Sequence, residues 1–66
     1  MNVTINGEIR KLPQKLNLTE LLAHFELPQE RVAVELNRQV VRRKDWETIV
    51  IADGDRLEVI HFVGGG

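Results

Sequence analysis

Apolar and polar residues alternate along the first five positions of the chain, with apolar side chains at positions 1, 3 and 5. This period of two is typical of a strand with one buried face. The Asn6-Gly7 pair that follows is the strongest two-residue signal for a type I′ hairpin turn. We therefore expect a hairpin whose second strand covers residues 8–12 and ends at Pro13, because proline has no N–H to donate to a sheet.

A helix is predicted to begin at Asn17. This residue suits an N-cap, and Glu20 stands three residues on, where its side chain can bond the N–H of the cap. The apolar residues that follow recur at helical spacing and form one stripe: Leu18, Leu21, Leu22 and Phe25. The helix must end before Pro28, because the residue preceding a proline disfavours the helical conformation.

Strand-like segments return in the second half of the chain. Residues 32–36 alternate and predict a third strand that ends at Asn37, with Val40-Val41 as a short continuation. Residues 42–46 lack alternation and predict a turn or a single helical turn. Residues 49–51 are all apolar and predict a further short strand.

The last predicted strand covers residues 57–62 and follows a turn at Asp53-Gly54-Asp55. Its odd-numbered residues 57 and 59 suit the core. The alternation therefore turns the even-numbered residues outward, including two large apolar side chains, Ile60 and Phe62. The order of the elements predicts a single α+β domain in which one helix lies across a mixed sheet.

Size and charge narrow the class of protein. The chain has 66 residues and a net charge of −1, so it supports one core and has no overall field that favours a nucleic acid or an anionic membrane as a partner. No apolar run approaches the roughly 20 residues that a membrane-spanning helix needs. The N-terminal residues have a strand pattern and no signal-peptide character, so a cytoplasmic location is expected.

The residues offer little for a self-contained enzyme, which needs an activated nucleophile, an acid/base pair or a metal site. There is no cysteine, which excludes disulfides and thiolate chemistry. His24 and His61 have no ligand-like spacing, and we expect the first on the solvent side of the helix and the second on the last strand. The aspartates around Gly54 lack the further ligands of an EF-hand, so a turn whose carboxylates bond local N–H groups is expected. No bound cofactor and no metal site are therefore expected.

One stretch after the third strand is rich in basic residues, which could contact phosphates or an acidic protein face: Arg38, Arg42, Arg43 and Lys44. It has no interleaved aromatic side chains on which single-stranded bases could stack, so a solvated charged face is the simpler interpretation. Trp46 is the only tryptophan, and we expect it to cover a small core rather than to bind a ligand.

The sequence ends in Gly64, Gly65 and Gly66, with no polar spacer after the last apolar strand. Three residues without Cβ atoms can extend and enter a channel too narrow for any other side chain. A terminal carboxylate delivered in this way can be activated by another protein, whereas a frayed end is the alternative interpretation. We expect residues 1–63 to form the folded domain and residues 64–66 a flexible tail.

Taken together, these features resemble the ThiS family of thiamine-biosynthesis sulfur carriers. The resemblance covers the whole chain, and it depends on the order of the following pieces: Asn6-Gly7, Glu20-Leu21-Leu22, Val34-Glu35-Leu36-Asn37, Val40-Val41, Arg43, Trp46, Asp53-Gly54-Asp55 and the ending His61-Phe62-Val63-Gly64-Gly65-Gly66. One departure is Arg42, where the family pattern often has proline.

The resemblance implies a ubiquitin-like β-grasp fold, with one main helix across a mixed sheet of four to five strands. It also implies a carrier rather than an enzyme, whose C-terminal Gly66 is adenylated with ATP by a ThiF-type enzyme and converted to a thiocarboxylate. The sulfur would come from a donor such as a cysteine desulfurase and pass to a thiazole synthase of the ThiG type. Because the chain has no cysteine, it cannot hold the sulfur as a side-chain persulfide.

Partners must recognise more than the tail. Ile60 and Phe62, together with Ala33, are the candidates for a small apolar docking patch, and coverage by a helix or by self-association is the alternative. Other functions stay open: a carrier subunit of molybdopterin synthase similar to MoaD, a ubiquitin-like modifier, or a non-catalytic β-grasp interaction module. The residues alone do not fix the sulfur acceptor, the sulfur donor or the oligomeric state.

Overall fold

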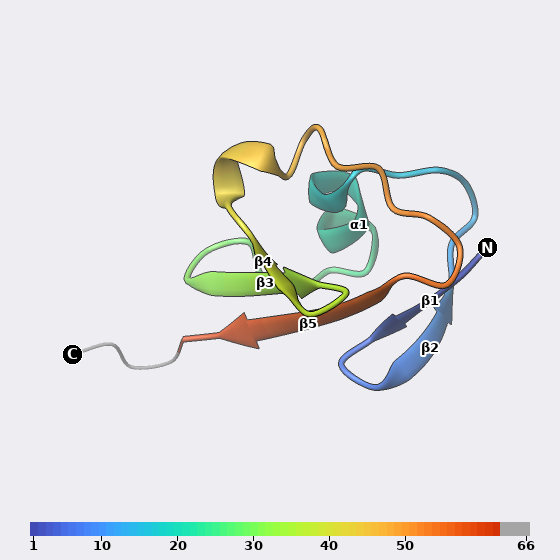
Figure 1. Cartoon of the computed structure of the whole chain (residues 1–66), viewed down its shortest axis with the longest axis horizontal. Helices are drawn as coiled ribbons and strands as arrows, with labels where there is room; N and C mark the ends of the chain where they lie inside the picture. Colours follow the sequence, from blue (N-terminus) through green and yellow to red (C-terminus); the bar gives the residue numbers. More distant parts are fainter. Residues whose placement is uncertain (63–66) are drawn as a thin grey trace.

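The computed structural model describes residues 1–62 and shows one helix packed across a five-stranded sheet (Figure 1). The strand order is β2-β1-β5-β3-β4, in which β1 and β5 are parallel and the other neighbours are antiparallel. The elements are β1 Asn2–Ile5, β2 Glu8–Lys11, α1 Leu18–His24, β3 Val32–Leu36, β4 Gln39–Val41, the 3₁₀ helix η1 Arg43–Asp45 and β5 Arg56–His61. The predicted mixed sheet with one main helix is confirmed.

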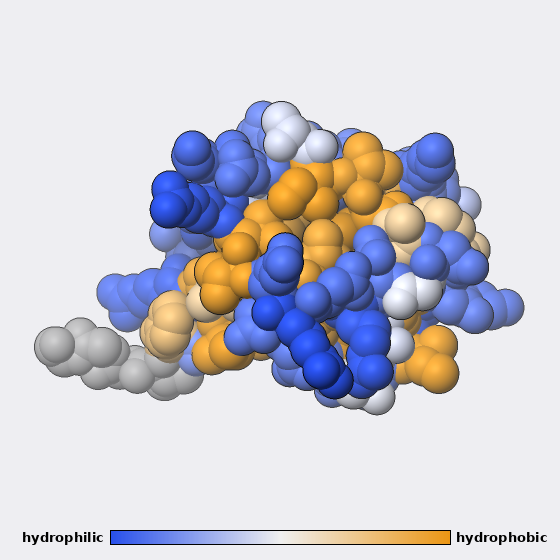
Figure 2. All heavy atoms as spheres, in the orientation of Figure 1, coloured by the Kyte–Doolittle hydropathy of each residue, from blue (hydrophilic) through white to orange (hydrophobic). Residues whose placement is uncertain are grey.

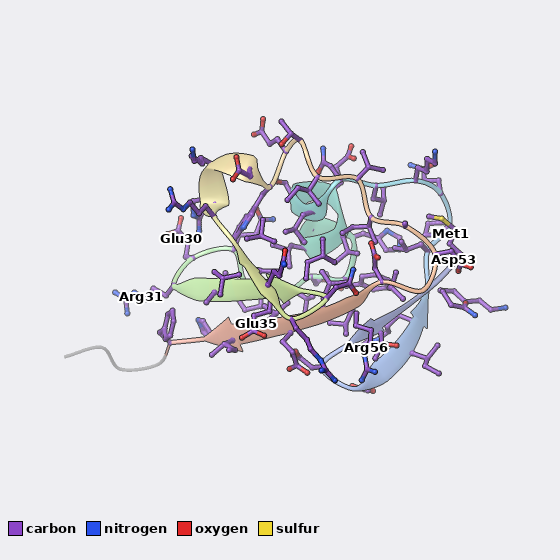
Figure 3. All side chains as sticks on the ribbon, in the orientation of Figure 1. Met1, Glu30, Arg31, Glu35, Asp53 and Arg56 are labelled. Carbon is purple, nitrogen blue, oxygen red and sulfur yellow. The ribbon has the colours of Figure 1, made fainter. Side chains whose placement is uncertain are left out.

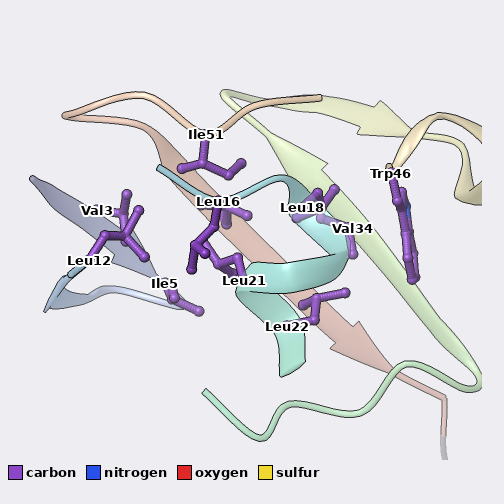
Figure 4. Close-up of a cluster of buried hydrophobic side chains, with 11 residues drawn as sticks. Val3, Ile5, Leu12, Leu16, Leu18, Leu21, Leu22, Val34, Trp46 and Ile51 are labelled. Atoms are coloured by element: carbon purple, nitrogen blue, oxygen red, sulfur yellow. The ribbon is translucent and has the colours of Figure 1, made fainter. Parts of the chain in front are cut away.

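The core lies between α1 and one face of the sheet, and the side chains from both layers meet there (Figure 4). The helix contributes Leu21 and Leu22, and the central strands contribute Val34 and Leu57; all four side chains are fully buried. Trp46 closes one end of this cluster, as predicted, with 3% of its surface exposed. Leu57 and Val59 point toward the helix, so the expected alternation of the last strand is confirmed.

The start of α1 has the predicted capping box. The backbone N–H of Glu20 donates to the Asn17 side chain at 2.8 Å, and the N–H of Asn17 donates to the Glu20 carboxylate at 2.9 Å. Two of the N–H groups that a helix start leaves unpaired are thereby satisfied. The helix ends at His24 with Phe25 as its C-cap, before Pro28 as expected.

Both tight hairpins use two residues with positive φ. The first is the predicted Asn6-Gly7 turn, with φ of 50° and 83°. The second joins β3 to β4 through Asn37 and Arg38, with φ of 50° and 71°. The sequence suggested that Val40-Val41 continues the third strand, and this prediction is wrong. The segment belongs to a separate strand that turns back along β3, because two successive left-handed residues reverse the chain.

The strand predicted at residues 49–51 is wrong. This segment forms only an isolated bridge between Val50 and Asn17, flanked by hydrogen bonds from Ile51 N–H to the Leu16 carbonyl and from Leu18 N–H to the Ile49 carbonyl, each 2.9 Å. The pairing stops there because its partner segment enters α1 at Leu18, where the backbone begins to bond within the helix. Its apolar pattern instead reflects the buried side chain of Ile51.

Candidate functional site

The glycines proposed as the working end of the protein, Gly64, Gly65 and Gly66, lie outside the described residues, and so does the boundary expected after residue 63. The structure does place the chain that leads to them. The described chain ends at Phe62, one residue after β5, which is the central strand of the sheet. The tail therefore continues from the middle of the fold rather than from an edge strand.

Two candidate docking residues are exposed on the face of the sheet away from α1. Ile60 and Phe62 have 46% and 54% of their surfaces exposed, and Ala33 is partly buried directly across from Ile60 in the sheet register. The structure thus brings the three predicted residues together as the tail-proximal patch, Ala33, Ile60 and Phe62. No helix of the described chain covers the patch, because α1 packs on the other face. In the view of Figure 2, hydrophobic surface reaches the C-terminal end of the described chain.

The same outer face becomes polar away from the tail. Glu35 and Glu58 stand directly opposite each other on β3 and β5, and Val40, which is 70% exposed, stands across from Glu35. These carboxylates line a hollow of about 310 Å³ with Arg38 and Arg56, and Figure 3 shows Arg56 projecting from the side of the sheet opposite the helix. The outer face therefore has a charged end and an apolar end, and the sequence did not reveal the contribution of Val40.

Two asparagine side chains hold β5 from both sides. The Asn6 side chain accepts from the N–H of Val59 at 2.8 Å and donates to the Val59 carbonyl at 3.3 Å. The Asn37 side chain accepts from the N–H of Arg56 and donates to the Asp55 carboxylate, each at 3.0 Å. Sequence reasoning identified both residues as turn formers and missed these bonds, because they join residues that lie far apart in the chain.

Of the aspartates around Gly54, Asp55 bonds a local N–H group as predicted, whereas Asp53 bonds an N–H group at the other end of the chain. The Asp53 carboxylate accepts from the N–H of Asn2 at 2.7 Å, and these parts of the chain lie together in Figure 3. The Asp55 carboxylate accepts from the N–H of Ala52 at 2.7 Å. Within residues 1–62, no group of three or more potential metal ligands comes together.

The histidines and the basic cluster lie on different parts of the surface. His24 is exposed on α1 and His61 on β5, as expected. The basic cluster is divided: Arg38 lines the outer-face hollow, whereas the Arg43 guanidinium stacks 4.6 Å from the centre of the Trp46 ring and donates to the Gln29 carbonyl. Arg43 therefore packs against the fold, a contact that the sequence pattern did not predict. None of the helices in the described part of the chain is long and apolar enough to span a membrane.

A comparison with protein families finds a match between residues 3–66 and the model of the ThiS family. The chain belongs to the ThiS family. This finding confirms the resemblance and covers nearly the whole sequence.

Solved structures and other proteins agree with membership of the ThiS family. The crystal structure of the thiamine biosynthesis protein ThiS from Geobacter metallireducens is 40% identical, covers all of both chains and superimposes with a TM-score of 0.87. The sulfur carrier protein ThiS of Bacillus subtilis is 35% identical over 74% of this chain and 74% of its own. These similarities confirm the β-grasp architecture.

A second kind of relative is longer. The thiazole synthase of Paramagnetospirillum magneticum is 35% identical over the whole of this chain, which spans only 20% of that protein's length. The same holds for the thiazole synthase of Magnetococcus marinus, at 38% identity and 20% of its length. A ThiS-like segment therefore occurs within longer proteins that carry the thiazole synthase name.

Proposed function

We propose that this chain is a sulfur carrier in the biosynthesis of the thiazole moiety of thiamine, and that it serves as a co-substrate of partner enzymes. The observation that carries the proposal is the membership of the ThiS family over residues 3–66, together with a sequence that follows the central strand with three glycines. In the mature carrier, Gly66 presents its terminal carboxylate to those enzymes.

The chemistry needs no reactive side chain from the carrier. A carboxylate is a poor electrophile, so a ThiF-type enzyme joins it to the AMP of ATP and releases pyrophosphate. The terminal sulfur of a donor cysteine persulfide then attacks the carbonyl carbon of Gly66 and AMP leaves. A second donor thiol cleaves the resulting acyl disulfide, which releases the thiocarboxylate and leaves a disulfide on the donor. The resulting thiocarboxylate is an ionised, soft nucleophile that donates its sulfur to a thiazole synthase of the ThiG type. The carrier's own part is to present an end without side chains, which enters a narrow active site.

The tail-proximal patch supplies the recognition that the glycines cannot. Burying a large apolar side chain is worth about 1.5–3 kcal/mol, so Ile60 and Phe62 together suit a transient complex that must release the carrier after each transfer. Long relatives named thiazole synthase support a partner of that class for this chain.

Intact-mass spectrometry tests the proposal. With ATP, a ThiF-type enzyme and a persulfide donor, the chain is expected to gain the mass of one oxygen-to-sulfur exchange at Gly66. A matched variant with one alanine added after Gly66 is expected to stay unmodified while folding normally, because every buried core residue of the described chain lies at or before Leu57. An unmodified wild-type chain in the presence of active enzymes would refute the proposal.

A carrier subunit similar to MoaD uses the same tail chemistry for another acceptor, and the names of the relatives favour the thiazole branch. Reaction of the sulfur-loaded carrier with thiazole synthase in one vessel and with the large subunit of molybdopterin synthase in another separates the two. Sulfur transfer only in the second vessel would reassign the acceptor and leave the carrier chemistry intact.

A further inference from the structure

Asn6 is the only asparagine of the chain that precedes a glycine. An asparagine side chain can cyclise when the nitrogen of the next peptide bond attacks its amide carbon, and a following glycine favours this attack because it has no Cβ to obstruct it. Both residues of the pair are exposed, and a Cβ added at Gly7 would meet no atom of the described chain within 4 Å. The turn is therefore open to solvent and has no steric protection at the attacking nitrogen.

The reaction is a deamidation that consumes only water. The Gly7 nitrogen forms a bond to the side-chain carbon of Asn6 and passes its proton through solvent to the side-chain nitrogen, which leaves as ammonia. The product is a cyclic imide. Water then opens the ring at either of its carbonyl carbons, which leaves an aspartate or an isoaspartate at this position of the chain.

The fold holds the Asn6 amide in a position that opposes this reaction. Its oxygen accepts from the Val59 N–H at 2.8 Å, and its nitrogen donates to the Val59 carbonyl at 3.3 Å. The side chain cannot turn its carbon onto the Gly7 nitrogen without breaking these bonds to β5. The pairing of β1 with β2 also fixes the turn on both sides, at φ of 50° and 83°. Cyclisation in the folded chain therefore requires a local opening of the turn.

We propose that Asn6 is a site of spontaneous deamidation, that its bonds to Val59 limit the rate, and that the product loosens β5. An aspartate accepts from the Val59 N–H but has no N–H for the Val59 carbonyl, so two oxygens face each other. An isoaspartate adds a methylene group to the main chain and disturbs the hairpin turn. Either product weakens the strand that carries Ile60 and leads to the C-terminal end. The proposal concerns the lifetime of the folded chain and is independent of the proposed function.

Asn37 offers a comparison within the same molecule. It begins the second hairpin turn at the same φ of 50°. Its side chain also holds the start of β5, where it accepts from the Arg56 N–H and donates to the Asp55 carboxylate, each at 3.0 Å. The next residue is Arg38, whose side chain obstructs the attacking nitrogen. Asn37 should therefore keep its amide, and Arg38→Gly should make it reactive.

Ageing of the full chain in mildly alkaline buffer tests the site, with peptide mass mapping and an isoaspartate methyltransferase assay as readouts. In the folded wild-type chain we expect ammonia loss at Asn6 and retention of the amides of Asn2 and Asn37. In guanidinium chloride the rate at Asn6 should rise about tenfold or more, because unfolding removes both bonds to Val59. Arg38→Gly should add Asn37 as a second site. Equal rates at Asn6 in the folded and unfolded chains, or a rate at Asn6 no greater than that at Asn2, would overturn the proposal.

Asn6→Asp reproduces one product and measures its effect on the fold. We expect Tm to fall by roughly 4–8 °C, because one hydrogen bond is lost and a carboxylate faces a carbonyl. Gln14→Glu is the matched control, since it makes the same amide-to-acid change at an exposed side chain without a hydrogen bond in residues 1–62, and it should leave Tm nearly unchanged. The deamidated wild-type chain, separated by ion exchange, should show the same fall as Asn6→Asp. Equal Tm values for Asn6→Asp and Gln14→Glu would overturn the claim that deamidation loosens β5.

Discussion

Replacing Asn6 with glycine isolates the two hydrogen bonds that this side chain makes to Val59. Glycine adopts the observed φ of 50° without strain, so the turn is kept and only the bonds of 2.8 and 3.3 Å are lost. A net value of about 0.5–1 kcal/mol for each bond, in the lower part of the usual range because the site is exposed, predicts a loss of about 1–2 kcal/mol in the free energy of unfolding. For a domain of this size that corresponds to a fall in Tm of roughly 5–15 °C.

Arg38→Gly is the matched control, because it makes the same kind of change in the second hairpin. Arg38 has a φ of 71°, and its side chain makes no hydrogen bond within residues 1–62. A left-handed conformation costs a residue such as arginine about 1–2 kcal/mol, and the extra freedom of glycine in the unfolded chain offsets about 0.5–1 kcal/mol of that relief. Arg38→Gly should therefore be neutral or slightly stabilising, in contrast to the loss of stability expected for Asn6→Gly.

Urea denaturation followed by the fluorescence of Trp46 measures both variants, since this buried residue is the only tryptophan. The reasoning would be refuted if Asn6→Gly matched the wild-type free energy within about 0.3 kcal/mol, which is below the range expected for even one lost bond. It would also be refuted if Arg38→Gly were as unstable as Asn6→Gly, because the loss would then follow from glycine in a turn and not from the lost side chain.

The remaining predictions concern the core, the helix cap and the patch. Leu21→Ala removes a fully buried side chain and should cost about 2–5 kcal/mol, which circular dichroism would register as a large fall in Tm or as an unfolded chain; a fall of only a few degrees would contradict the assigned core. Asn17→Ala breaks the capping box with Glu20 and should cost about 0.5–2 kcal/mol in urea titrations; an unchanged midpoint would count against the cap. Phe62→Ser should leave Tm nearly unchanged, because the side chain is mostly exposed. In calorimetry it should weaken binding to the adenylating enzyme by about tenfold or more. The control Val40→Ser, at a residue that is exposed on the same face but lies outside the patch, should bind normally.

Local signals predicted most of the fold. The Asn6-Gly7 turn, the Asn17 cap and the alternation around Ile60 are short-range patterns, and the structure contains each of them. The apolar segment at residues 49–51 was predicted to be a strand, but it forms only a single bridge. The pairing cannot extend because its partner segment enters the helix at Leu18. Tertiary context decided the outcome, as it often does for short apolar runs.

The site could be predicted only in part, for a similar reason. The exposure of Ile60 and Phe62 follows from the period of two along one strand. The bonds from Asn6 to Val59 depend on which strand lies beside β5 and on where that strand ends. These facts link residues more than 50 positions apart in the sequence, and no local pattern encodes them.

The parallel pairing of β1 and β5 also determines how the domain responds to force. A pull applied between Met1 and Phe62 draws the two strands past each other in opposite senses, since one begins at the N-terminus and the other leads to the C-terminal end of the described chain. The hydrogen bonds from Thr4 to Asp55 and from Asn6 to β5 are then loaded simultaneously in shear and do not break one after another. Under the proposed function, a partner that pulls on this end of the chain would therefore meet a fold that resists tension along β5.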